Sequence, residues 1–191
     1  MAVRDALLAL LTTGPAYGFQ LHGGLAERTG GRRVVNVGQT YATLERLAKQ
    51  RLVESAGTTP DGLPLHRLTT AGQDAATAWL SGADAAGADP WDETVDRVLI
   101  ALSLPHADSG AIVASERAKW SERHSDATAA ATGASAGQAA LASLAARAEA
   151  ARAQAALDWL SEAASQDAGT LAFAPSSTRP RRGRRPAAPA A

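Results

Sequence analysis

Residues 36–55, NVGQTYATLERLAKQRLVES, combine a helical pattern with a strand-like segment that follows it closely. Asn36 is a good N-cap, because its side-chain oxygen can accept a hydrogen bond from a backbone amide of the first helical turn. Apolar residues then recur at helical spacing. Leu52 and Val53 begin a strand, turn-forming residues occupy 57–62, and the run 63–68 predicts the returning strand of a hairpin.

The predicted helix at 37–49 has two different sides. Its apolar side is expected to face the core and consists of Tyr41, Leu44, Leu47 and Ala48. Its polar side follows the same spacing and consists of Gln39, Thr43, Arg46 and Gln50. We expect the polar side to remain outside the core, where a partner could contact it.

The flanking segments complete a recognisable order. Residues 3–11 and 16–28 predict two preceding helices, separated by Gly14-Pro15. A further helix begins at Thr69 or Thr70 and ends near Leu80. The order helix, helix, helix, hairpin, helix is that of a winged helix-turn-helix. In that fold the third helix can enter a DNA major groove and the wing can lie along the neighbouring backbone.

The rest of the chain predicts a second, helical unit. Helices are expected at 91–104, 109–127 and 138–164, with a break at 132–137. The last helix carries an apolar stripe that one small chain cannot cover, so a second copy is its natural partner. The stripe consists of Leu141, Leu144, Ala148, Ala151, Ala155 and Trp159.

We therefore predict a mainly α protein with four segments. They are a winged helix-turn-helix DNA-binding domain at 1–81, a linker at 82–90, a helical dimerisation domain at 91–166 and a disordered basic tail at 167–191. Residues 1–81 carry a net charge of +2, residues 82–166 carry −6, and residues 167–191 carry +4. Such uneven charge suggests segments with separate roles.

The composition and the apolar runs of the chain bear on the cellular compartment of the protein. The chain has no cysteine, and therefore no disulfide and no thiolate site. The early apolar run, residues 6–11, is too short for a signal peptide. No segment approaches the roughly 18 apolar residues of a membrane span. We expect a cytoplasmic protein without a membrane partner.

Over residues 3–81 the sequence resembles the PadR family of bacterial transcriptional regulators. The resemblance rests on LLALLTTGPAYGFQLHGGLAERTG, VGQTYATLERLAKQRLVE and HRLTTAGQDAATAWL. Further on, RVLIALSLP and AQAALDWL are similar to the helical part through which the family dimerises. The resemblance implies a sequence-specific regulator of double-stranded DNA, acting as a homodimeric repressor that a small-molecule inducer releases. The alternative is a winged-helix module that contacts protein and has little DNA affinity.

Candidate DNA contacts follow from the third helix, the segment before it and the wing. They are Arg32, Arg33, Gln39, Thr40, Tyr41, Thr43, Arg46, Lys49, Gln50, His66 and Arg67. The family often has proline where this chain has Ala42, and its wing is usually more basic. The tail motif RPRRGRR could add affinity for any DNA sequence. By the same resemblance, Trp120 and Trp159 are candidates to bind a flat aromatic inducer.

The sequence does not support a catalytic site or a metal site. GASAG at 133–137 matches the pattern of a nucleophile elbow around Ser135, but it lies between two helical segments and not after a strand. The four histidines, at 22, 66, 106 and 124, have no metal-ligand spacing. We predict a protein that is not an enzyme and needs no cofactor.

Overall fold

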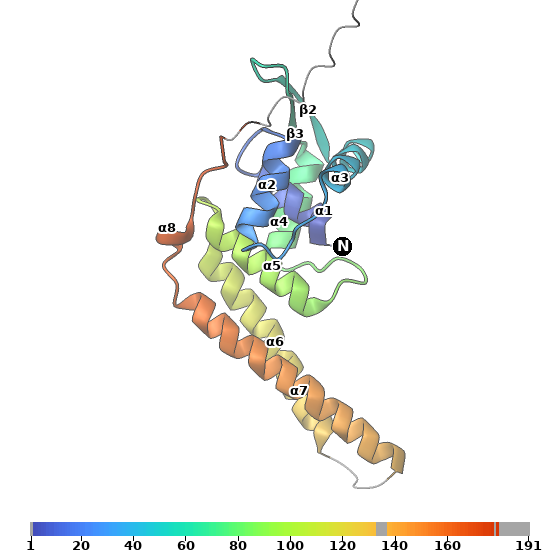
Figure 1. Ribbon diagram of the computed structural model, residues 1–191. Helices are drawn as coiled ribbons and strands as arrows, with labels where there is room; N and C mark the ends of the chain where they lie inside the picture. Colours follow the sequence, from blue (N-terminus) through green and yellow to red (C-terminus); the bar gives the residue numbers. More distant parts are fainter. Residues whose placement is uncertain (1, 133–136, 178, 180–191) are drawn as a thin grey trace, which may run out of the picture.

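The computed structural model describes residues 2–132, 137–177 and 179 (Figure 1). Its N-terminal part, residues 2–81, is called the head. The head contains α1 (Ala2–Leu11), β1 (Ala16–Tyr17), α2 (Gly18–Arg28), α3 (Val37–Lys49), β2 (Val53–Thr58), β3 (Pro64–Leu68) and α4 (Thr70–Leu80). The predicted fold class, a winged helix-turn-helix followed by further helices, is confirmed.

The sheet of the head is antiparallel in the order β1-β3-β2. The hairpin of β2 and β3 pairs Val53 with Leu68, as expected for a wing. Strand β1 was not predicted, because two residues are too short to show an alternating pattern. It pairs Ala16 with His66, and this fixes the start of α2 against the base of the wing.

The close succession of α3 and β2 has a local cause. Arg51 adopts a left-handed conformation with φ of 57°. Its amide donates to the carbonyl of Ala48 at 2.9 Å, and the amide of Leu52 donates to the carbonyl of Leu47 at 3.0 Å. These two bonds form a Schellman motif, which satisfies the last helical carbonyls and reverses the chain sharply. The wing therefore starts two residues after Arg51.

The start of helix α4 packs against the sharp turn between α3 and β2, which we call the corner. The amide of Thr69 donates to the carbonyl of Leu52 at 3.1 Å, and its hydroxyl donates to the carbonyl of Arg51 at 2.7 Å. A Cβ atom on Gly72 would lie only 1.9 Å from the oxygen of Leu52. Only glycine allows α4 to approach the corner this closely.

The C-terminal part contains α5 (Pro90–Ser103), α6 (Ser109–Ala131), α7 (Gly137–Ala164) and α8 (Ala168–Leu171). Helices α6 and α7 form a long hairpin that projects away from the head (Figure 1). Helix α6 runs to Ala131, beyond the predicted end at 127, and residues 133–136 of the predicted break lie outside the described residues. Within the described ranges, none of the helices is long and apolar enough to span a bilayer.

Helix α5 belongs to two hydrophobic cores. Ile100 and Leu104, just beyond its end, pack in the core of the head with residues of α1, α2, α3 and α4. Val98 and Leu102 pack in a second core with Trp120 of α6 and Leu160 of α7. The two parts of the chain are therefore joined by a shared, buried helix.

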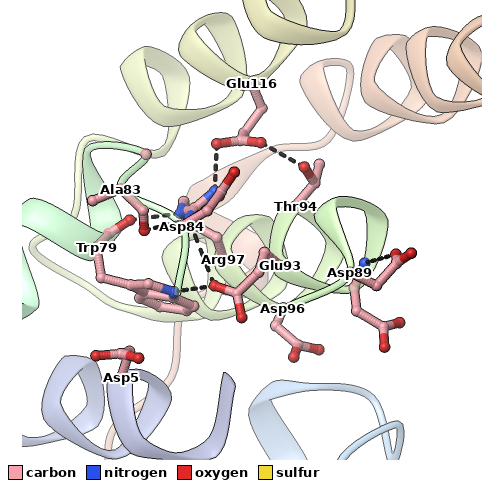
Figure 2. A network of polar contacts seen from close by, with 12 residues as sticks. Asp5, Trp79, Ala83, Asp84, Asp89, Glu93, Thr94, Asp96, Arg97 and Glu116 are labelled. Atoms are coloured by element: carbon pink, nitrogen blue, oxygen red, sulfur yellow. Dashed lines mark hydrogen bonds and ion pairs between the residues drawn. The ribbon is translucent and has the colours of Figure 1, made fainter. Parts of the chain in front are cut away.

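A buried polar network strengthens this junction (Figure 2). Arg97 of α5 is fully buried and donates to Glu116 of α6 at 2.5 Å and to the carbonyl of Trp79 at 2.5 Å. The indole N–H of Trp79 donates to Glu93 of α5 at 2.7 Å. Thr94 of α5 also donates to Glu116. Buried charges are tolerated only when paired and hydrogen-bonded, so this network fixes α4, α5 and α6 relative to one another.

The expectation of a disordered tail from residue 167 onward is wrong for its first part. Asp167 caps α8 by accepting a hydrogen bond from the amide of Gly169 at 3.0 Å. The amide of Phe173 then donates to the carbonyl of Ser103 at 3.2 Å, which places this segment against the end of α5. Residue 178 and residues 180–191, with four of the five tail arginines, lie outside the described residues.

Candidate nucleic-acid interface

Helix α3 begins where the sequence predicts. The side chain of Asn36 accepts a hydrogen bond from the amide of Gln39 at 2.7 Å and so caps the helix. The helix ends 13 residues later at Lys49, before the Schellman corner. Both ends are thus determined by local hydrogen bonds, and the rotation of the helix about its axis decides which side chains face outward.

The inward side of α3 differs from the prediction. It consists of Thr40, Thr43, Leu44 and Leu47, all buried. The hydroxyl of Thr40 lies 3.3 Å from Nδ1 of His22, and that of Thr43 donates to the carbonyl of Gln39 at 2.8 Å. Because a threonine whose hydroxyl is bonded locally can be buried at little cost, the polar residues misled the assignment of the face. Thr40 and Thr43 are therefore buried on the inward side of α3, and their role as DNA contacts stays a prediction.

Tyr41 and Ala48, predicted to be on the apolar side, are instead exposed. Tyr41 is 42% exposed and its ring stands against the first residue of α2. A Cβ atom on Gly18 would lie 2.5 Å from Cε1 of Tyr41. Tyr41 is thus held over the start of α2 with its hydroxyl close to that helix end, a position in which a phosphate could meet both.

The outward centre of α3 carries Gly38, Ala42, Glu45 and Lys49, all exposed. Of these, only Lys49 was predicted as a contact. Gln39, Arg46 and Gln50 are also exposed, but they flank this centre on the side of α1. Together with Val3 and Arg4 they line a recess of about 130 Å³. The outward centre of α3 therefore carries different and smaller side chains than those predicted for its polar side.

Arg32 and Arg33 precede α3 but contact α5. Nη2 of Arg32 donates to Asp92 at 2.8 Å, and both side chains are about half exposed. Nε of Arg33 donates to Asp96 at 2.5 Å, and the carboxylate of Asp96 is fully buried. Their predicted role as phosphate contacts is untested, but each arginine already has a carboxylate partner within the chain.

The Arg33–Asp96 pair is electrostatically asymmetric. Burial raises the pKa of Asp96, and the guanidinium of Arg33 offsets this only in part. Burial also opposes the charge of Arg33, but hydrogen bonds and charge interactions with Asp96 and Asp92 outweigh it and raise the pKa of Arg33. The difference follows from position, since Arg33 keeps partial contact with solvent and Asp96 does not.

The wing offers few free cations. Arg67 of β3 pairs with Glu54 of β2 at 2.8 Å, and both are exposed. His66 lies half-buried in the central strand, and burial lowers its pKa. At the tip, Asp61 accepts from the hydroxyl of Thr59 at 2.6 Å and lies 3.5 Å from Nη1 of Arg179. The cation at the tip therefore comes from the C-terminal tail.

The two candidate inducer residues belong to a cluster of tryptophans. Trp91 meets Trp120 edge-on at 5.9 Å and Trp159 edge-on at 5.3 Å, measured between ring centroids. Trp120 is buried, and its indole N–H donates to the hydroxyl of Thr94 at 2.9 Å. Trp159 is only half-buried. The two candidates are thus brought near one another through Trp91, a residue that sequence reasoning did not select.

A groove beside Trp120 lies between α6 and α7. Its volume is about 510 Å³, and its lining includes Arg123, Arg152 and several alanines but not Trp159. The guanidinium carbon of Arg123 lies 4.8 Å from the Trp120 ring centroid, and that of Arg152 lies 6.0 Å from it. Two cations and one aromatic ring therefore meet at this groove, together with the carboxylates of Asp126 and Glu149.

Among the described residues, no group of three or more His, Asp or Glu side chains is placed to hold a metal ion. Ser135, the residue of the GASAG motif, lies outside the described residues.

Residues 7–78 match the sequence model of the family described as "Transcriptional regulator PadR-like family". Over these residues the chain is similar to that family. The match runs from the second half of α1 to residue 78 near the end of α4, that is, over most of the head with its wing. Comparison with curated proteins gives no match.

Solved structures similar to this chain include two of Bacillus subtilis PadR. The structure in complex with operator DNA is 18% identical, with a TM-score of 0.39, and the alignment covers 83% of this chain and 94% of the other. The structure in complex with p-coumaric acid is 17% identical, with a TM-score of 0.38, and the alignment covers 85% and 96%.

Sequence reasoning about the head missed two kinds of residue. Gly38, Ala42 and Glu45 were missed because they are small or acidic, yet helical phase relative to Leu44 and Leu47 could have placed them outward. Arg179 was missed because nothing in the sequence indicates that the tail returns to the wing.

Proposed function

We propose that this chain is a sequence-specific DNA-binding transcriptional regulator that acts as a dimeric repressor and is released by a small-molecule inducer. One observation carries the proposal. Helix α3 is capped at Asn36, ends at a tight corner and turns an exposed surface outward directly beside a wing. This is the arrangement that helix-turn-helix proteins use in the major groove. The match of residues 7–78 to a family of transcriptional regulators supports it.

The proposed reading surface uses the N-terminal half of α3. Val37 is 44% exposed, and Gly38 and Ala42 follow on the outward side. Small and apolar side chains allow the helix to approach the base edges closely and can contact thymine methyl groups. Lys49 and Arg46, in the last turn, are placed to contact the phosphate backbone and would make affinity depend on salt.

A second copy of the chain is the proposed partner of α7. Leu141 is 69% exposed and Leu144 is 63% exposed, although both are large and apolar. Ala148, Ala151 and Ala155 extend the same stripe and are also exposed, whereas α6 packs on another side of α7. Two such stripes facing each other would bury them and set the distance between two heads.

The proposed inducer site is the groove beside Trp120. The ring edge and alanines would contact an aromatic body, and polar groups of the ligand would meet both the arginines and the carboxylates of Asp126 and Glu149 that line the groove. Such a ligand can release DNA only if it binds one arrangement of the dimer better than the other. The hydrogen bond from Trp120 to Thr94, and from Thr94 to Glu116, connects this groove with the polar network that holds α4.

Selection of bound sequences from random duplexes tests the function. Enrichment of a motif with twofold symmetry is expected for a dimer with two reading heads. A second experiment changes the outward centre of α3. Ala42→Glu should weaken DNA binding about tenfold or more, because it places a negative charge against the DNA. Ala111→Glu, exposed in the first turn of α6, is the matched control and should bind DNA as the wild type does. Thr43→Ala should alter stability more than sequence preference.

The alternative is a protein-interaction module with little DNA affinity. It is favoured by the wing, where Arg67 is already paired with Glu54. No enriched sequence, together with equal and weak binding by wild type and Ala42→Glu, would support it and overturn the proposal.

A further inference from the structure

The cations of the head that have no carboxylate partner gather at the end of α3. Residues 2–81 contain eight arginine and lysine side chains. Four of them form ion pairs with carboxylates, and Arg28 is buried with hydrogen-bond partners of its own. Arg46 donates only to neutral acceptors of its own helix. Within these described residues, three exposed cations therefore form no ion pair, and they are Arg46, Lys49 and Arg51.

The acidic residues on either side do not cancel this charge. Glu45 is exposed one turn before Lys49, but the two side chains form no ion pair in the described structure. Glu54, in β2, is already paired with Arg67. Residues 45–51 contain one acidic and three basic side chains. The end of α3 therefore carries a surplus of positive charge that is exposed to solvent.

Arg51 has an unusual backbone conformation for an arginine. Its φ of 57° is the only positive value at a non-glycine residue in the described part of the chain. Its amide donates to the carbonyl of Ala48 at 2.9 Å, and its carbonyl accepts from the hydroxyl of Thr69 at 2.7 Å. These bonds use only backbone atoms of residue 51, so a glycine would form both of them. The corner itself therefore does not require an arginine side chain.

The fold gains little from the side chain of Arg51. The left-handed conformation costs an arginine more than a glycine. A cation just after a helix interacts favourably with the helix dipole, but solvent and salt screen this interaction at an exposed position. Arg46 and Lys49 already supply such cations in the last turn of α3. Backbone strain of this kind occurs most often at functional sites. A partner outside the fold would account for it.

We propose that Arg51 binds a phosphate of the DNA backbone at the corner, with Lys49 and Arg46 beside it. The inference deepens the proposed function and rests on it, since it needs DNA at the head. Figure 1 shows α3 and β2 next to each other at one edge of the head, and Arg51 lies between them in the chain. The corner thus joins the helix proposed to enter the major groove to the wing proposed to lie along the backbone.

The chemistry of an arginine suits this ligand. A guanidinium presents two parallel N–H donors that match two oxygens of one phosphate, and it stays charged at physiological pH. Such a contact carries no sequence information, because every nucleotide presents the same phosphate. Arg51 should therefore raise the affinity for all duplexes and leave the choice among them to other residues of α3.

The first test measures DNA affinity against salt. Arg51→Gln removes the charge and keeps the left-handed strain, and Arg117→Gln, exposed on α6, is the matched control. Arg51→Gln should weaken binding to specific and random duplexes by the same factor, about fivefold or more at low salt. It should also lower the salt slope by about one unit per subunit. The control should bind as the wild type does. Equal affinity and slope for the wild type and Arg51→Gln would overturn the proposal.

The second test separates DNA contact from folding. Arg51→Gly removes the charge and also relieves the left-handed strain. It should weaken DNA binding as much as Arg51→Gln does, while its urea midpoint of unfolding rises above that of the wild type. A structural role of the side chain predicts the opposite change in stability. Weaker binding together with a lower midpoint would therefore refute a role outside the fold.

The third test locates the contact on the DNA. Phosphates of the selected duplex are replaced one at a time by neutral methylphosphonates. The wild type should lose affinity at each phosphate that it contacts. At one phosphate per half-site this loss should disappear in Arg51→Gln, because that contact is already absent. Identical losses at every position in both proteins would rule out a direct contact by Arg51.

Failure of this inference differs from failure of the proposed function. A wild type that binds DNA, together with an Arg51→Gln variant that binds equally well, contradicts the inference alone. A wild type that binds no duplex at low salt contradicts the proposed function itself, as does DNA binding that Ala42→Glu leaves unchanged.

Discussion

Nε of Arg33, in the segment that leads into α3, donates to the fully buried carboxylate of Asp96 in α5 at 2.5 Å. The second oxygen of that carboxylate lies 3.9 Å from Nε of Arg32. These contacts join the entry of the proposed recognition helix to the helix that both cores share. Arg33, which the sequence suggested as a DNA contact, thus also joins the segment before α3 to α5.

Arg33→Ala should lower the free energy of unfolding by about 3 kcal/mol, because it leaves a buried carboxylate without its partner. Arg32→Ala is the matched control. It breaks a solvent-exposed pair with Asp92 and should cost less than about 1 kcal/mol. Urea unfolding followed by circular dichroism measures both. Equal losses for the two variants would contradict a structural role specific to Arg33.

Asp89 and Asp96 should make opposite contributions to the pH dependence of the free energy of unfolding. The hydrogen bonds from Arg152 hold the pKa of Asp89 below its usual value, so its contribution to stability is present above about pH 4 and is lost as the pH falls. Burial holds the pKa of Asp96 above its usual value, so its contribution is present below about pH 4 and is lost as the pH rises through the folded pKa.

The measurement compares the wild type with Asp89→Asn and with Asp96→Asn, in unfolding experiments from about pH 3 to pH 7. Asparagine keeps a hydrogen-bond acceptor at both positions and removes the negative charge together with its titration. Relative to Asp89→Asn, the wild type should lose stability toward low pH. Relative to Asp96→Asn, it should lose stability toward neutral pH. Slopes of the same sign would refute one of the two assignments.

The corner after α3 predicts a stabilising substitution. Arg51→Gly should raise the free energy of unfolding by about 1 kcal/mol, because φ of 57° costs an arginine more than a glycine. Lys49→Gly, the same kind of change two residues earlier inside the helix, should lower it by about 1 kcal/mol. Thermal unfolding of both variants checks the signs, and destabilisation by Arg51→Gly would argue against the left-handed corner.

The exposed stripe of α7 predicts the oligomeric state. Light scattering should give twice the chain mass of 19.5 kDa for the wild type. Leu141→Glu with Leu144→Glu should give a monomer that keeps its helical content, because both side chains are exposed in the isolated chain. Thr77→Glu, exposed on α4 of the head, should remain dimeric. A wild type that is monomeric at micromolar concentration would remove the basis for twofold operator recognition.

Local signals made the order of the elements predictable. Asn36 caps α3 as its type suggests, and Thr69 caps α4 by accepting a hydrogen bond from Gly72 at 3.1 Å. Apolar spacing placed Leu44 and Leu47 in the core correctly. These features depend on neighbours within a few residues, which is the range that a single sequence reveals.

The candidate site was less predictable, because it depends on contacts between distant segments. Thr40 looks polar in sequence but is buried against His22, and Tyr41 looks apolar but lies exposed over Gly18. Arg33 looks free but is paired with Asp96, 63 residues later in the chain. No periodicity within α3 carries information about these partners. The predicted position of α3 along the chain was therefore correct, but the side of the helix predicted to face outward differs from the side that is exposed in the structure.

The place of α5 in both cores has a mechanical consequence. Val98 and Ile100 are two residues apart and pack into different halves of the molecule, so a rotation of this helix cannot be absorbed by one half alone. Helix α7 has 28 residues and, at about 1.5 Å per residue, is about 42 Å long. A tilt of about 5° at its inner end displaces its outer end by roughly 3.5 Å, given that length. A small rotation of α5 would therefore be amplified at the far end of the helical hairpin and would also be felt in the head that carries α3.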